Sequence, residues 1–188
     1  MNQFYNHGHY WHEDHPVMLD EETYKGLMRD VTKNNLPGAI VHNLPHRDWA
    51  PLLRSVQFVE CEGGLMKFFV RNRYNGWFTY VKFTDWAQVV VDPDITAPEA
   101  ARLLLWAGNI QLHCPCASFK YHGYQFILTQ KDSAIFSETR YPKIRNPELK
   151  GIACKHCRKV LKILPFHLGT MAKYIKIERV SIDNRGKH

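Results

Sequence analysis

Two closely spaced pairs of metal-binding residue types constrain this chain more than any other feature of its sequence. Cys114 and Cys116 form a Cys-x-Cys pair, Cys154 and His156 form a Cys-x-His pair, and 37 residues separate the two. Zinc in structural sites takes four sulfur or nitrogen ligands at the corners of a tetrahedron. Because four protein ligands leave no position open for a substrate, the pattern predicts one structural Zn²⁺ rather than a catalytic metal.

The sequence around each pair predicts how the ligands converge. The segment NIQLHC predicts a strand that delivers Cys114 at its end, and Pro115 favours a kink that turns both thiolates to one side. Residues 155–164 are predicted as a helix, so Cys154 and His156 lie at its start, where free backbone amides stabilise a thiolate. One ion would then join the end of a strand to the start of a helix.

Two alternatives to this ligand set stay open at the level of sequence. Cys157 forms a Cys-x-x-Cys half-site with Cys154 and could replace His156 as the fourth ligand, giving a Cys₄ site. The cysteines could instead be small buried residues of the core. The chain has five cysteines, the fifth being Cys61, and its first residues are not expected to form an export signal, which argues against a disulfide framework.

The ligand pattern resembles that of the SWIM-type zinc module, in which Cys114, Cys116, Cys154 and His156 would all bind zinc. The resemblance covers about residues 109–166, and it includes a preceding β-hairpin and a helix that begins with the Cys-x-His pair. The spacer is longer than is usual in SWIM modules. With its CPC, PKIRNP and CKH motifs, this longer form is similar to small SWIM-like proteins encoded by large tailed bacteriophages.

This resemblance implies a structural component of a phage virion. Such a protein is made in the host cytoplasm and is incorporated into the tail, baseplate or neck, where it contacts other virion proteins in a multi-subunit assembly. The sequence shows no organised nucleophile, base and electrophile, so we expect no enzymatic activity. No apolar run approaches the roughly 20 residues needed to cross a bilayer, so we expect no membrane partner.

Hydrophobic patterning predicts an α+β fold, with a small antiparallel sheet, flanking helices, a zinc-stapled C-terminal module and an extended N-terminal arm. Strands are expected in residues 55–64, 65–74 and 77–86, with Asn75-Gly76 as a type I′ hairpin turn. Residues 87–92 (AQVVVD) are expected to form a further short strand. Thr96 begins a capping box for a helix that Gly108 ends.

The segment between the two ligand pairs has weaker patterning. It is expected to start strand-like around Gly123, to become weakly helical, and to form a loop over residues 138–151, which contain two prolines. Pro165 is expected to stop the helix that starts at residue 155. A last short helix is expected near residues 167–176.

One domain is expected over residues 20–182, between an N-terminal arm (1–19) and a polar tail (183–188) that frays. A first helix is expected to start at Asp20. The arm contains four histidines, which could bind a second metal ion or simply belong to a segment that packs on a neighbour: His7, His9, His12 and His15.

The positive charge of the chain is concentrated near its C-terminus. Residues 140–188 contain thirteen Lys and Arg against three acidic residues, a net +10, so the remainder carries −3 of the total +7. A basic segment suits nucleic acid or an acidic patch of another subunit, although a solvated helix face has the same composition. The expected docking residues are Lys143, Arg145, Lys155, Arg158, Lys159 and Lys162, near tyrosines that could stack on bases.

Overall fold

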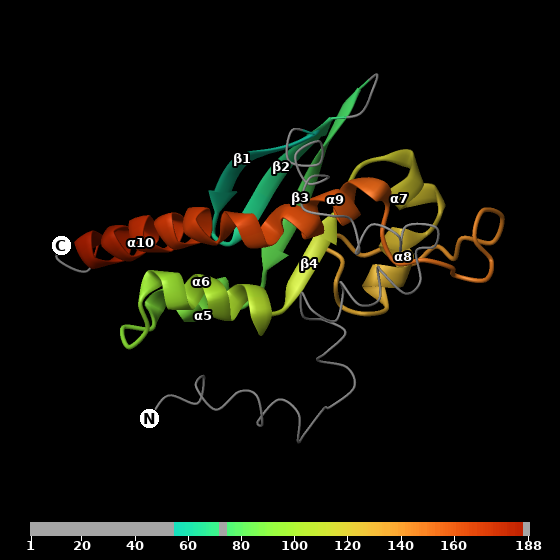
Figure 1. Cartoon of the computed structure of the whole chain (residues 1–188). Helices are drawn as coiled ribbons and strands as arrows, with labels where there is room; N and C mark the ends of the chain where they lie inside the picture. The colour runs from blue at the N-terminus through green and yellow to red at the C-terminus, as the bar shows by residue number, and fades with distance from the viewer. Residues whose placement is uncertain (1–54, 72–74, 186–188) are drawn as a thin grey trace.

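The computed structural model describes residues 55–71 and 75–185 (Figure 1). The expected N-terminal arm, its histidines and the helix from Asp20 lie outside the described residues. The described part contains a four-stranded antiparallel sheet in the order β1-β2-β3-β4, formed by β1 (Val56–Glu62), β2 (Leu65–Arg71), β3 (Gly76–Phe83) and β4 (Ile110–His113). Together with the helices that flank it, this sheet confirms the α+β prediction.

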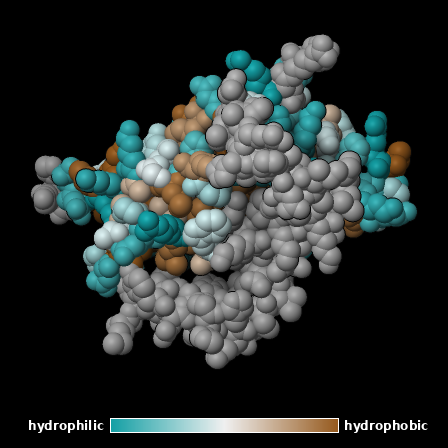
Figure 2. Space-filling view, viewed as in Figure 1, coloured by the Kyte–Doolittle hydropathy of each residue, from teal (hydrophilic) through white to brown (hydrophobic). Residues whose placement is uncertain are grey.

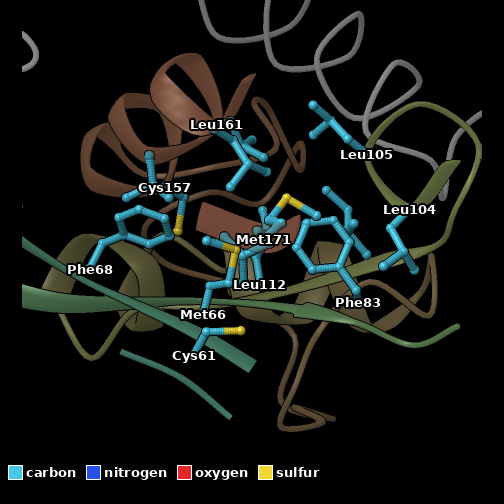
Figure 3. Close-up of a cluster of buried hydrophobic side chains, with 14 of the residues drawn as sticks. Cys61, Met66, Phe68, Phe83, Leu104, Leu105, Leu112, Cys157, Leu161 and Met171 are labelled. Atoms are coloured by element: carbon cyan, nitrogen blue, oxygen red, sulfur yellow. The ribbon is translucent and has the colours of Figure 1, made fainter. Parts of the chain in front are cut away.

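One face of the sheet is apolar and buried, as the alternating pattern of β2 predicts. Met66, Phe68 and Val70 are fully buried, while the intervening side chains belong to the other face. Helices α9 (Lys155–Ile163) and α10 (Leu168–Arg185) cover the buried face, and α6 (Ala97–Trp106) packs beside α10 (Figure 1). Side chains from the sheet, α6, α9 and α10 meet in a single core (Figure 3).

The hairpin turns differ in detail from the prediction. The β2–β3 hairpin is present, but Arg71 pairs with Gly76, so Gly76 is the first residue of β3 rather than a turn residue. A Cβ at Gly76 would lie 2.1 Å from the Phe69 ring, so close packing explains this glycine. The tight two-residue turn is Gly63-Gly64 between β1 and β2, where both φ angles are positive as a type I′ turn requires.

The expected strand at residues 87–92 is wrong, because α5 (Trp86–Val91) occupies that segment. Its β-branched residues favour a strand only by local propensity, which tertiary packing overrides. Trp86, Val89 and Val90 are buried together on one helical face, while Val91 is exposed. The helix that follows is confirmed: Thr96 caps α6 with the complete capping box to Glu99.

Between the two ligand pairs, the expected strand-like start is also wrong. The segment forms two short helices, α7 (Ala117–Tyr121) and α8 (Tyr124–Thr129), separated by Gly123 in a left-handed conformation. Residues 138–151 form the predicted loop without helix or strand. Helix α9 ends at Ile163, two residues before Pro165, which agrees with the prediction that this proline stops the helix. A 3₁₀ turn, η4 (Leu164–His167), leads into α10, which extends to Arg185 and is longer than expected.

Candidate metal centre

The first ligand pair lies where β4 leaves the sheet. Cys114 directly follows the last residue of β4, and Cys116 is the N-cap of α7. The Cys116 backbone is extended, and its Sγ accepts a hydrogen bond from the Phe119 amide at 3.3 Å. A thiol therefore occupies the position in which Ser, Thr or Asp side chains ordinarily cap a helix. This local geometry fixes the orientation of Cys116 toward Cys114.

The second ligand pair lies at the start of α9. Cys154 is the N-cap of α9, and His156 lies in the first turn of that helix. The positive end of the helix dipole points at this position, which favours negative charge on the Cys154 sulfur. The predicted strand end and helix start therefore meet, although they are far apart in the sequence.

The structure brings all four predicted ligands into one cluster. The candidate ligand atoms of Cys114, Cys116, Cys154 and His156 all lie within 4.8 Å of one another. His156 Nδ1 is 3.6 Å from Cys114 Sγ and 4.0 Å from Cys154 Sγ. The four residues are almost completely buried, with exposed fractions of 1%, 3%, 1% and 2% in chain order. This cluster could hold a metal ion.

The cluster is close in size to the ligand shell of a tetrahedral ion with three thiolates and one imidazole. Zinc bonds of about 2.3 Å to sulfur and 2.0 Å to nitrogen place two sulfurs about 3.8 Å apart and a sulfur about 3.5 Å from a nitrogen. The His156 Nδ1 separations of 3.6 and 4.0 Å agree with this shell. Sulfur and imidazole donors in a tetrahedron are the set that zinc prefers.

The buried surroundings shift the pKa values of the clustered thiols in opposite directions. Hydrogen bonds, first from the Cys116 thiol and then from those of Cys154 and Cys157, hold the pKa of Cys114 well below its ordinary value. Burial raises the pKa of Cys154. Zinc binds cysteine in its deprotonated form, so a divalent ion at this site would stabilise negative charge on the clustered sulfurs.

Cys157, the alternative fourth ligand, does not belong to the cluster of four. Its Sγ lies 3.6 Å from Cys154 Sγ, but its side chain is fully buried and lies beside Phe68 and Leu161 in the core (Figure 3). Burial raises the pKa of the Cys157 thiol well above its ordinary value. The cluster of four therefore contains His156 and not Cys157, although the Cys157 thiol also lies against the cluster, beside Cys154.

One neighbour of the cluster is a residue that the sequence analysis did not identify. Thr79, fully buried on β3, donates its hydroxyl hydrogen to Cys114 Sγ at 3.7 Å. Such outer contacts orient a ligand and stabilise its negative charge. Thr79 stands out in the sequence only as a polar residue at a buried position of a strand, and the pairing of β3 with β4 is needed to place it beside Cys114.

The predicted docking cations fall on two separate parts of the fold. Lys143 and Arg145 are exposed in the loop over residues 138–151. The other four lie on α9 and differ in exposure: Lys155 is exposed, Arg158 and Lys159 are half-buried, and Lys162 is buried with 7% of its surface exposed. Lys159 donates a hydrogen bond to Ser55. Among the described residues, therefore, the basic side chains of α9 form a half-buried stripe rather than a fully exposed face.

Comparisons with known proteins give no relative for this chain. No family model matches it, and neither a curated protein nor a solved structure is significantly similar to it. No helix among the described residues is both long and apolar enough to cross a bilayer. The candidate metal centre is therefore the feature from which a function can be argued.

Proposed function

We propose that this chain is a zinc-stapled structural subunit that acts by contacting other proteins. The observation that carries the proposal is the closed, buried cluster of three cysteines and one histidine at the junction of β4, α7 and α9. A metal ion with four protein ligands in such a site stabilises a fold and leaves no coordination position for chemistry. The proposal therefore includes no enzymatic role.

A metal ion at this site would compensate for the weak regular structure of the segment between the ligand pairs. Helices α7 and α8 are each about a turn and a half long, and the following loop lacks regular secondary structure. Short helices are unstable without tertiary support. A structural zinc ion contributes about 10 kcal/mol or more to folding in small modules, enough to fix this segment to the sheet.

Exposed large apolar side chains supply candidate contacts for partner proteins. Ile144 is 93% exposed, and Val91, Phe136 and Phe166 also have more than half of their surface exposed. Exposed aromatic and aliphatic side chains are the anchors that protein interfaces bury. These residues lie on different elements, so they fit a subunit with several neighbours better than a single binding site.

The identity of the partners rests on the resemblance of the CPC, PKIRNP and CKH motifs to the SWIM-like proteins of large tailed phages. On that basis the partners are virion proteins of the tail, baseplate or neck, and the chain is located in the particle. The test is peptide mass spectrometry of gradient-purified particles of the phage that encodes the chain. The proposal expects peptides of this chain at a fixed ratio to a known structural protein, and its absence from intact particles would contradict the virion role.

A second candidate function is nucleic-acid binding through the basic residues of α9. The observation that favours it is that α9 presents three cations to solvent, the exposed Lys155 and the half-buried Arg158 and Lys159. Duplex DNA binding measured at two salt concentrations tests this function. Affinity that persists near physiological salt, with a steep salt dependence, would support it, whereas weak binding that disappears there would oppose it.

A further inference from the structure

A hollow of about 610 Å³ lies between the end of α7 and the loop over residues 138–151. It belongs to neither the metal centre nor the basic stripe of α9. In Figure 2, a small hydrophobic group stands among hydrophilic atoms at the far right, where Figure 1 shows this loop. The residues that line the hollow are Tyr121, Tyr141, Pro142, Lys143, Ile144 and Arg145.

The loop that forms one wall of the hollow is held in place by specific contacts. Asn146 is 8% exposed, and its side-chain amide donates to the His122 carbonyl at 3.0 Å and to the Lys150 carbonyl at 2.9 Å. A Cβ at Gly123 would lie 2.4 Å from Pro142, so the loop packs directly against the left-handed break before α8. The hollow is therefore formed before any ligand arrives.

Two tyrosine rings contribute aromatic surface to the hollow. Tyr121 is 58% exposed and Tyr141 is 44% exposed. The Tyr141 ring is fixed by an edge contact with Phe126, at 5.5 Å between centroids, and by the hydrogen bond that its hydroxyl donates to the Pro147 carbonyl. Both rings therefore keep surface available for stacking, and the fold limits the movement of Tyr141.

The charge around the hollow is positive. Lys143 and Arg145 line it without an acidic residue among the lining side chains. The two nearest acids in the sequence are already paired: Glu138 with Arg140 at 2.7 Å, and Glu148 with Lys150. An anionic ligand would meet these cations without an opposing carboxylate in the wall of the hollow.

We propose that this hollow binds single-stranded nucleic acid, with bases stacked on Tyr121 and Tyr141 and phosphates beside Lys143 and Arg145. Aromatic platforms beside cations are the combination that holds single strands without reading their sequence. A duplex keeps its bases paired and stacked, so it cannot offer their faces to these two rings. This inference goes beyond the assembly role and does not depend on it, and it assigns a surface other than α9.

The test is fluorescence anisotropy of the full, metal-loaded chain with a labelled oligothymidylate of about 12 nucleotides, a length within the range that such sites occupy. We expect binding at about 50 mM salt, with a log–log salt slope near −1.4, which corresponds to two phosphates at about −0.7 each. We also expect at least about tenfold weaker binding for the Y121L/Y141L variant, which keeps apolar area but removes stacking, and for K143E/R145E.

Matched variants on α10 and η4 control for charge and for exposed aromatic area. K173E/K176E makes the same charge change at two exposed positions of α10, and F166A removes an exposed ring from η4. Both should bind the oligonucleotide like the parent chain. Circular dichroism and metal content confirm that each variant folds.

Four results would overturn the inference: no binding at low salt, parent-like binding by Y121L/Y141L, equal binding of the same sequence as a duplex, or competition by poly-L-glutamate as strong as that by unlabelled oligothymidylate. The last result would identify an acidic protein segment as the ligand. Absence of the chain from phage particles would contradict the assembly role but would leave each of these binding results unchanged. The two proposals can therefore fail separately.

Discussion

Lys162 illustrates how the environment of a single residue differs from what its sequence neighbours indicate. Spacing along α9 places Lys162 on a polar stripe with Arg158 and Lys159, yet its side chain is buried, with only 7% of its surface exposed. Its Nζ has no hydrogen-bond partner among the described residues. Burial lowers the pKa of Lys162 from 10.5 to about 8, and the nearby Arg158 adds to that effect. Folding therefore carries an uncompensated charge at neutral pH.

Replacing this lysine with an apolar residue of similar length should stabilise the protein. We expect the K162M variant to have a free energy of unfolding about 1–2 kcal/mol higher than the parent near neutral pH, because no charge is buried. The gain should be present below pH 8 and should shrink between about pH 8 and pH 10.5, where the lysine of the parent loses its proton. Urea unfolding of both chains across this range measures the difference.

The exposed Lys173 on α10 gives the matched control, since K173M should leave stability nearly unchanged. A K162M chain that is less stable than the parent near neutral pH would show that the Lys162 ammonium has a favourable partner.

At the scale of elements, α5 depends on a contact from the other end of the chain. The Arg179 guanidinium on α10 donates to four backbone carbonyls at or just after the end of α5, at 2.8–3.1 Å: those of Val89, Val90, Asp92 and Ile95. A helix C-terminus leaves its last carbonyls without partners, and a cation there also interacts favourably with the helix dipole. One side chain therefore satisfies the end of a helix whose valines favour a strand.

Removing this guanidinium should destabilise the whole domain. We expect R179A to lower the free energy of unfolding by about 2–4 kcal/mol, because several carbonyls lose a charged donor in a partly buried site. R185A is the control, because Arg185 is exposed and its hydrogen bonds within the described part of the chain go to Ser181 on its own helix. Thermal and urea unfolding measure both variants, and an R179A loss no larger than that of R185A would contradict this role.

The elements also show which parts of the fold the sequence can predict. The capping box at Thr96 and the alternation along β2 are local signals, and both are confirmed. The helical state of α5 depends on Arg179, which lies almost ninety residues away. Helix α7 begins after Cys116, which acts as its N-cap, and a cysteine is not a residue type whose propensity signals a helix start. The Arg179 contact is long-range and the Cys116 cap uses an unusual capping residue, so neither has a local pattern that reveals it.

The metal centre should control the order of the segment between the ligand pairs. We expect C154S to lose the bound ion and to show faster amide hydrogen exchange over residues 117–153, because α7, α8 and the loop lose their attachment to α9. C61S removes a buried thiol from β1 outside the cluster and is the matched control. Equal exchange in C154S and the parent, measured by mass spectrometry, would show that the segment does not depend on the ligands.

For the whole molecule, the residues that form the candidate metal centre can be predicted from the sequence better than the packing around them. Residue type and spacing identify the Cys-x-Cys and Cys-x-His pairs, and the structure brings them together. From the sequence, either His156 or Cys157 could be the fourth ligand, because spacing does not show which of two adjacent helix residues points toward the other ligands. The packing of the fold shows that the Cys157 side chain is buried in the core. The hollow beside Tyr121 and Tyr141 depends on how a loop folds back, which spacing does not encode.

The most direct test of the whole account is the metal content of the native chain, purified without added metal and measured by inductively coupled plasma mass spectrometry. The account predicts one zinc ion per chain, retained through dialysis against a weak chelator, because four buried ligands enclose it. A correctly folded chain that contains no stoichiometric metal would contradict the central claim that one ion joins β4, α7 and α9.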